Sequence, residues 1–201
     1  MASALSLPDS AYVPVSATPI KVLIAGHFGV GKTTFVGSVS EIDPLRTEER
    51  ITTASIGVDD LTGRGQKTTT TVAMDFGRIT LPGDEFALYL FGLSGQMRFL
   101  PVTDELMQGA KGAVLIADTR TLDSSFPVAD YLEKRRVPYA VALNQFDDAR
   151  RQYDLAEVRT ALDLRPETPL VRCDARDTSS CKATLITLFE YLISLVTPEH
   201  S

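Results

Sequence analysis

The chain has 201 residues, of which 44% are hydrophobic and 23% are charged, the balance of a globular protein with one well-formed core. Its formal net charge of −6 argues against a nucleic-acid-binding surface, because phosphate backbones are bound by a basic footprint, and it gives no support to a membrane-surface role. The only two cysteines, Cys173 and Cys181, do not form the pattern of a disulfide framework, which favours a reducing cytoplasm.

The two ends of the chain carry no recognisable targeting or lipidation signal. Residues 1–18 contain no basic segment followed by an apolar run, and no stretch of the chain approaches the ~20 apolar residues that span a bilayer. Ala2 stands where myristoylation needs glycine, and the last residues are not a prenylation box. We therefore expect a flexible leader over 1–18, one folded domain over 19–197, a short tail over 198–201, and a cytoplasmic location.

From residue 20 onward, short apolar runs alternate with helical patterns. Six runs are predicted to be strands, at 20–26, 71–81, 86–92, 112–118, 139–146 and 169–175. Helices are predicted from about 31 to 40 and over 124–135, 155–162 and 182–196. A turn at 82–85 joins two strands as a hairpin, and residues 41–70 show no period, so we expect a long functional loop there. This order predicts a three-layer α/β fold, with a mainly parallel six-stranded sheet, one antiparallel hairpin strand and helices on both faces.

The segment Gly26–Thr33 matches the pattern GxxxxGK[ST] at every fixed position, and it lies between a predicted strand and a predicted helix. Its glycines would let backbone N–H groups point at a β-phosphate, and the helix N-terminus would add its positive dipole end. Lys32 would bind the β- and γ-phosphates, and the Thr33 hydroxyl would hold Mg²⁺. The residues expected to bind the phosphates are His27, Phe28, Gly29, Val30, Gly31, Lys32, Thr33 and Thr34. The alternative is a glycine-rich turn with an incidental lysine, and the motif alone does not say which nucleotide binds.

The sequence Asn144-Gln145-Phe146-Asp147 stands at the end of a predicted strand, where open α/β sheets bind ligands. It resembles the NKxD element of Ras-like GTPases, with Gln145 in the place of lysine. Guanine presents N1–H and N2–H₂ side by side, and the Asp147 carboxylate can accept both, whereas adenine offers neither donor at that edge. Asn144 would fasten this segment to the phosphate loop or reach guanine N7. As an isolated match, a strand end leading into a turn explains these residues equally well.

A third match follows the next predicted strand. The residues Cys173-Asp174-Ala175-Arg176 resemble the [ST]AK element of the same GTPases, in which a backbone N–H contacts guanine O6. On this alignment Ala175 gives the contact, Arg176 packs beside the base, and Cys173 belongs to the same binding segment. Together the two elements favour guanine over adenine.

With these motifs in place, the chain resembles the Ras superfamily over residues 20–196. The runs KTTTTVAMDFGRITL (67–81) and LYLFGLSGQMRF (88–99) resemble most the bacterial Ras-like GTPases of the actinobacterial conservon operons. The bacterial gliding-polarity GTPases are similar at a greater distance. The resemblance implies that GTP, GDP and Mg²⁺ bind, and that the partners are a roadblock/LC7-type protein and a membrane protein like a sensor histidine kinase.

The resemblance also implies roles for the switch residues. Thr71 stands where such GTPases carry the threonine that binds Mg²⁺ and the γ-phosphate, so Thr33 and Thr71 are the expected metal ligands. Gly95 would donate its N–H to the γ-phosphate, and Gln96 would be the catalytic residue that orients the attacking water. Gly92 replaces the aspartate that normally holds Mg²⁺ through water. Metal binding is therefore expected to be weaker or to use another ligand.

Two further departures predict slow hydrolysis. Phe28 occupies a position that is glycine in Ras proteins, and Thr70 stands where the gliding-polarity relatives place an internal arginine finger. Arg98 could substitute, although a solvent-facing switch residue is the simpler interpretation. Two functions stay open: a slowly hydrolysing GTP switch, and a pseudo-GTPase that holds its nucleotide as a structural ligand. An ATPase or small-molecule kinase is disfavoured by Asp147.

Overall fold

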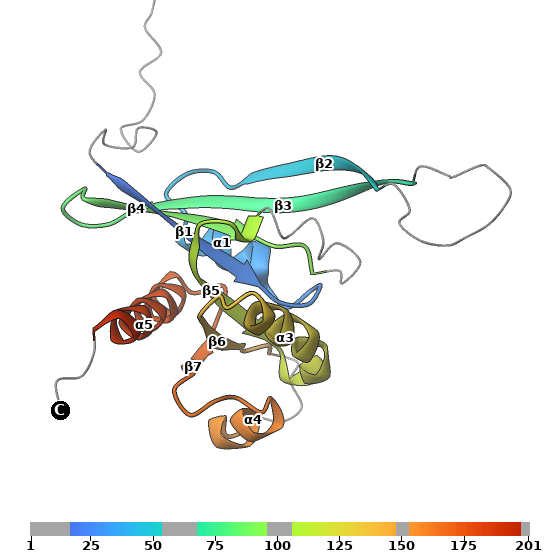
Figure 1. Cartoon of the computed structure of the whole chain (residues 1–201), viewed down its shortest axis with the longest axis vertical. Helices are drawn as coiled ribbons and strands as arrows, with labels where there is room; N and C mark the ends of the chain where they lie inside the picture. The colour runs from blue at the N-terminus through green and yellow to red at the C-terminus, as the bar shows by residue number, and fades with distance from the viewer. Residues whose placement is uncertain (1–16, 54–67, 96–105, 148–152, 198–201) are drawn as a thin grey trace, which may run out of the picture.

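The computed structural model describes residues 17–53, 68–95, 106–147 and 153–197, and a seven-stranded sheet runs through them (Figure 1). The strands are β1 (Thr18–Ala25), β2 (Leu45–Thr53), β3 (Thr68–Thr80), β4 (Phe86–Gly92), β5 (Ala110–Ala117), β6 (Tyr139–Asn144) and β7 (Leu170–Cys173). Their order across the sheet is β2-β3-β4-β1-β5-β6-β7. β3 is antiparallel to both of its neighbours and the other pairings are parallel, so among the described strands β3 alone runs against the rest.

The helices follow the strands in the predicted alternation. They are α1 (Lys32–Val39), the 3₁₀ segment η3 (Thr119–Ser125), α3 (Phe126–Lys134), α4 (Leu155–Ala161) and α5 (Thr178–Val196). The prediction of a three-layer α/β fold is confirmed, with its six strands and its single antiparallel strand all present. α5 begins before residue 182, where it was predicted, because the Asp177 carboxylate caps it by accepting from the N–H groups of Ser179 and Ser180.

The seventh strand, β2, was not predicted. It lies in the segment expected to be a long loop, and it pairs with β3 from Leu45 opposite Phe76 to Thr53 opposite Thr68. Its sequence LRTEERITT is mostly polar and charged. An edge strand needs no apolar face and is often charged, so the alternation that reveals inner strands is missing here.

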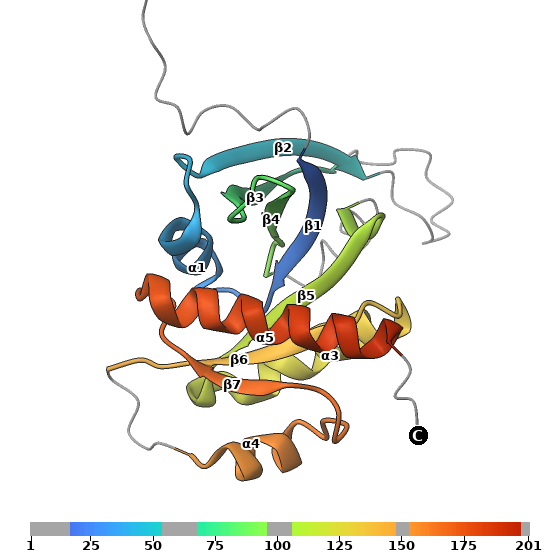
Figure 2. The same ribbon diagram turned by 90° about the vertical axis from the view of Figure 1, so that its left-hand side faces the viewer.

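Two apolar layers join the sheet to its helices. On β1, Val22 and Ile24 pack into the layer that contains residues of α1 and α5, whereas Leu23 and Ala25 pack into the layer that contains residues of α3 and α4. All four side chains are fully buried, which explains why β1 reads as a continuous apolar run. Figure 2 shows α5 lying across the sheet on one side and α3 on the other. The sheet therefore holds the C-terminal ends of its parallel strands rigidly at one edge.

The prediction that no stretch of the chain approaches a membrane-spanning length is wrong for α5. Among the described helices it alone is long and apolar enough by length and composition, with 19 residues and a mean hydropathy of 1.3. In this fold one side of α5 is buried against the sheet, through Cys181, Thr184, Leu185 and Leu188. α5 thus packs on the sheet with one side, while Ile186, Ile193 and Val196 are exposed.

The buried side of α5 predicts a stability difference between two aliphatic residues of the same helix. Leu188→Ala should lower the free energy of unfolding by about 2–5 kcal/mol, because Leu188 is fully buried and its removal leaves a cavity. Ile186→Ala is the matched control, since Ile186 is 58% exposed and its truncation should have little effect. Urea unfolding of both variants measures this, and equal losses would contradict the assigned packing of α5.

Candidate nucleotide-binding site

The loop between β1 and α1 has the backbone shape that its glycines were predicted to allow. Gly26, Gly29 and Gly31 all have positive φ angles, of 142°, 82° and 105°. A Cβ on Gly26 would lie 2.5 Å from the Ile116 carbonyl oxygen, and one on Gly31 would lie 2.6 Å from Asn144 Nδ2. A Cβ on Gly29 would meet nothing, so that glycine is required by conformation alone. The loop is therefore a tightly turned segment against the ends of β5 and β6.

Lys32 lies at the start of α1 and curls back over this loop. Its Nζ donates to the carbonyl oxygens of Gly26, at 2.9 Å, and His27, at 2.7 Å. Burial lowers the pKa of the Lys32 ammonium to about 8, and the nearby carboxylate of Asp75 opposes this shift. The ammonium has thus lost part of its hydration, and a bound phosphate group would stabilise its positive charge.

The other residues of the loop differ in exposure. Val30 is buried, whereas Thr33 and Thr34 are exposed on the first turn of α1. Phe28 is 71% exposed, and the His27 ring nitrogen Nδ1 lies 3.0 Å from the Phe28 carbonyl oxygen. The predicted phosphate-binding residues therefore form one short loop and the first turn of α1, where Thr33 is exposed.

A carboxylate that the sequence analysis missed lies beside Thr33. Thr33 Oγ1 donates a hydrogen bond of 2.5 Å to Asp75 Oδ2. Asp75 is on β3, directly opposite Gly92 on β4. A Cβ on Gly92 would lie 3.0 Å from Asp75 Cβ and 3.3 Å from Asp75 Oδ2, so the Asp75 side chain occupies the space that a side chain at Gly92 would need. The structure therefore has a carboxylate beside Thr33, on the strand next to the one that carries Gly92.

The segment after β4 passes directly over the phosphate loop. A Cβ on Gly95 would lie 2.4 Å from the Phe28 nitrogen and 2.7 Å from Lys32 Nζ, so only glycine fits there in this arrangement. The predicted catalytic residue, Gln96, lies outside the described residues, and so does Arg98. Thr71 is in β3, but its side chain is not among those described.

The segment predicted to recognise guanine, residues 144–147, is joined to the phosphate loop by one buried amide; it is named the guanine-recognition segment after that prediction. Asn144 Nδ2 donates to the Val30 carbonyl oxygen at 2.9 Å, and Asn144 Oδ1 accepts from the Ala175 N–H at 2.9 Å. Of the two roles predicted for Asn144, the structure has the first, fastening to the phosphate loop. Gln145 is exposed, and its N–H donates to the Cys173 carbonyl oxygen at 2.8 Å. The three predicted binding segments therefore meet at Asn144.

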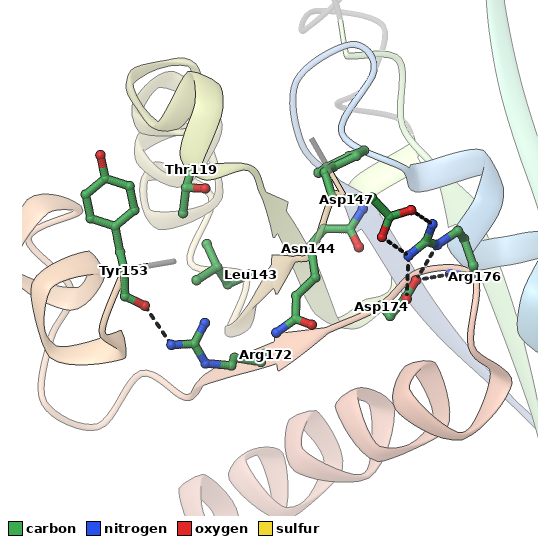
Figure 3. Close-up of a pocket in the computed structure, with 10 residues that line it drawn as sticks. Thr119, Leu143, Asn144, Asp147, Tyr153, Arg172, Asp174 and Arg176 are labelled. Atoms are coloured by element: carbon green, nitrogen blue, oxygen red, sulfur yellow. Dashed lines mark hydrogen bonds and ion pairs between the residues drawn. The ribbon is translucent and has the colours of Figure 1, made fainter. Parts of the chain in front are cut away.

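Arg176 lies between two carboxylates at the rim of this site (Figure 3). Its guanidinium donates to both oxygens of Asp147, at 2.7 and 3.1 Å, and to both oxygens of Asp174, at 2.9 and 2.8 Å. These hydrogen bonds hold the pKa of Asp147 below its usual range and lower the pKa of Asp174 to about 2. Asp147 is thus an ionised acceptor, 84% exposed, whose present partner offers a planar pair of N–H donors.

The predicted role of Cys173 in binding is confined to its backbone. Its side chain is 1% exposed in the core below the site, next to Cys181, whose thiol lowers the pKa of Cys173 through a hydrogen bond. Beside Asn144 and Asp147, a cavity of about 220 Å³ opens between the ends of β6 and β7, with Thr119, Tyr153 and Arg172 in its wall (Figure 3). The exposed polar groups of the site face this edge of the sheet.

The comparisons with known proteins agree with the loop and the fold. A family model described as "Conserved hypothetical ATP binding protein" matches residues 24–195, and the chain belongs to this family. No curated protein matches the chain significantly in sequence.

Solved structures with the same fold include the G domain of the T. maritima FeoB iron transporter. It is 20% identical to this chain with a TM-score of 0.57, and the match covers 90% of this chain and 100% of that one. The cytosolic domain of the same transporter is similar in its GDP form I, at 19% identity and a TM-score of 0.60, covering 88% of this chain and 64% of that one. Its GMPPNP form is similar at 20% identity and a TM-score of 0.60, covering 86% and 64%. This chain spans slightly less than two thirds of those cytosolic domains, and the likeness is one of fold.

The bridging role of Asn144 predicts a large loss of stability from a small truncation. Asn144→Ala should leave the Val30 carbonyl and the Ala175 N–H without their partner, at about 1–3 kcal/mol for each buried group. Gln145→Ala, at the exposed neighbouring position, is the control and should change the free energy of unfolding little. Chemical denaturation without nucleotide compares the two. Equal free energies of unfolding for the two variants would show that the Asn144 hydrogen bonds do not stabilise the fold.

Proposed function

We propose that this member of the family is a guanine-nucleotide-binding switch, which binds GTP and GDP and slowly hydrolyses GTP to GDP. The observation that carries the proposal is the Asn144 bridge, because it brings the phosphate loop, the guanine-recognition segment and the Ala175 N–H to one place. A turn with an incidental lysine would have no reason to be joined to both other motifs. In this arrangement the phosphate loop would bind the phosphates, the Asp147 carboxylate would bind the edge of the base, and the Ala175 N–H would bind its carbonyl.

The preference for guanine is our interpretation of Asp147, although the family description names ATP. The Asp147 carboxylate already accepts from two N–H groups of Arg176, which lie in one plane as the N1–H and N2–H₂ donors of guanine do. Adenine offers the Asp147 carboxylate neither of these two donors at that edge. The similar T. maritima cytosolic domains were solved in GDP and GMPPNP forms, which is in line with this choice.

We further propose that Mg²⁺ is held by Thr33, with Asp75 in the role that Gly92 cannot fill. A hydroxyl and a carboxylate oxygen 2.5 Å apart are hard oxygen donors of the kind that Mg²⁺ prefers. Among the described residues no cluster of three or more His, Cys, Asp or Glu is suited to a metal. Thr71 remains a proposed second ligand.

For hydrolysis, Gln96 is the proposed residue that orients water and Gly95 the proposed donor to the γ-phosphate. The close approach of Gly95 to Phe28 and Lys32 supports the role proposed for Gly95. Exposed Phe28 at the crest of the loop, and the absence of an arginine at Thr70, support a slow rate that depends on a partner.

The alternative is a pseudo-GTPase that binds nucleotide without hydrolysing it. Gly92 was one of its two supports, and Asp75 weakens that support by supplying a carboxylate at the same place. Phe28 still favours it. By the conservon-type resemblance, we propose a cytoplasmic protein whose partners are a roadblock/LC7-type protein and a sensor-kinase-like membrane protein.

The proposed metal site predicts that Asp75→Asn raises the Mg²⁺ concentration needed to retain bound GDP, on the order of tenfold, because a neutral amide holds neither the cation nor the Thr33 hydroxyl as well. Release of a fluorescent GDP analogue during Mg²⁺ titration measures this. Asp130→Asn, an exposed change of the same kind on α3, is the control. An unchanged Mg²⁺ requirement for Asp75→Asn would remove Asp75 from the site.

The proposed catalytic role predicts that Gln96→Leu abolishes single-turnover hydrolysis of GTP while leaving GTP binding intact, because leucine cannot orient water. The wild-type protein and Gln96→Leu are loaded with GTP to the same extent, and the GDP formed by each is measured over time. Negligible rates in both, even with the roadblock-type partner added, would reject the hydrolase and leave the pseudo-GTPase.

A further inference from the structure

An ion pair with a buried carboxylate lies at the end of β5, outside the groups assigned so far to the nucleotide. Asp118 follows β5 directly, and its side chain is only 5% exposed. Its carboxylate accepts from three N–H groups of Arg120: the backbone N–H at 2.8 Å, Nε at 2.9 and 3.1 Å to its two oxygens, and Nη2 at 2.7 Å. The guanidinium of Arg120 is therefore fixed in position by a carboxylate that is itself fixed at the end of the sheet.

The fixed guanidinium lies against an aromatic ring of the guanine-recognition segment. Arg120 Cζ is 3.7 Å from the centroid of the Phe146 ring, a close cation–π contact. Phe146 is half-buried and stands between Gln145 and Asp147. The contact thus joins the end of β5 to the loop after β6, on the residue immediately before the carboxylate proposed to bind guanine.

Arg176 contacts Asp147 directly by donating to both of its oxygens, but a bound guanine would donate to the same oxygens in its place. Asn144 and Gln145 are held by hydrogen bonds to the phosphate loop, Ala175 and Cys173, but these end two residues before Asp147. The Asp147–Arg176 ion pair is also exposed to solvent, which screens it. The Phe146 ring is therefore the last anchored point before Asp147.

We propose that Arg120 is a positioning residue for guanine specificity, which acts through the Phe146 ring to aim the Asp147 carboxylate at the base. The inference rests on the proposed guanine-nucleotide function. A carboxylate accepting N1–H and N2–H₂ together must have both oxygens correctly placed, and a small rotation loses one of the two hydrogen bonds. A misplaced Asp147 carboxylate should therefore weaken the binding of guanine more than the binding of a base with only one of the two donors.

The test compares GDP with inosine diphosphate, whose base keeps N1–H and lacks the exocyclic amino group. The wild-type chain should bind GDP at least about tenfold more tightly, the effect of one hydrogen bond to a charged acceptor. Phe146→Leu removes the ring but keeps the Asp118–Arg120 pair, and Arg120→Lys keeps a cation for Asp118 but loses the planar stack. Each should lower the GDP-to-inosine-diphosphate ratio by about threefold or more.

Arg135→Lys is the matched control, because Arg135 contacts the Tyr131 ring in the same manner, away from the site, with Cζ 5.5 Å from the ring centroid. It should leave the ratio unchanged, and Asp147→Asn gives the ratio expected when the carboxylate is lost. If Phe146→Leu and Arg120→Lys weaken both nucleotides by one factor, or lower only the melting temperature, Arg120 is merely structural and the inference is overturned. If the wild-type chain itself does not prefer GDP, the guanine assignment fails instead.

Discussion

The side-chain amide of Asn144 is the interaction on which the rest of the site depends. A single amide can donate and accept at once, so Asn144 satisfies the buried Val30 carbonyl with Nδ2 and the Ala175 N–H with Oδ1. These groups belong to segments far apart in the chain, which the parallel strands β1, β6 and β7 bring to the same edge of the sheet. The same amide lies so close to Gly31 that a Cβ there would meet it at 2.6 Å, which couples the shape of the phosphate loop to the position of the base-binding segments.

Around this joint the charges are distributed in a way that suits an anion and a cation together. Lys32 is desolvated and its pKa is lowered to about 8, so a phosphate that restores negative charge beside it would stabilise the ammonium. Asp75 stands near enough to oppose that shift and also accepts from Thr33. The site therefore presents a cation and a carboxylate side by side, the groups needed for phosphate and for the metal that neutralises it.

Much of this could be predicted from sequence, because the constraints involved are local. The phosphate loop requires glycine at fixed spacing between a strand and a helix, and the inner strands are apolar on both faces. Asp75 could not be found in this way, because its place opposite Gly92 depends on the register between β3 and β4, which no spacing along the chain encodes. β2 was missed because its charged sequence carries no period. The contact of Arg120 with Phe146 was also invisible, since it joins the ends of two strands whose adjacency is a property of the sheet.

The central claim is that the base bound here is guanine, within a family whose description names ATP. The most direct measurement is the displacement of a fluorescent GDP analogue by unlabelled GDP and by ADP, at saturating Mg²⁺, followed by fluorescence polarisation. GDP should displace the probe at concentrations about a hundredfold or more below those of ADP, because guanine can donate both N1–H and N2–H₂ to the Asp147 carboxylate and adenine can donate neither. Displacement by ADP at equal or lower concentrations would contradict it.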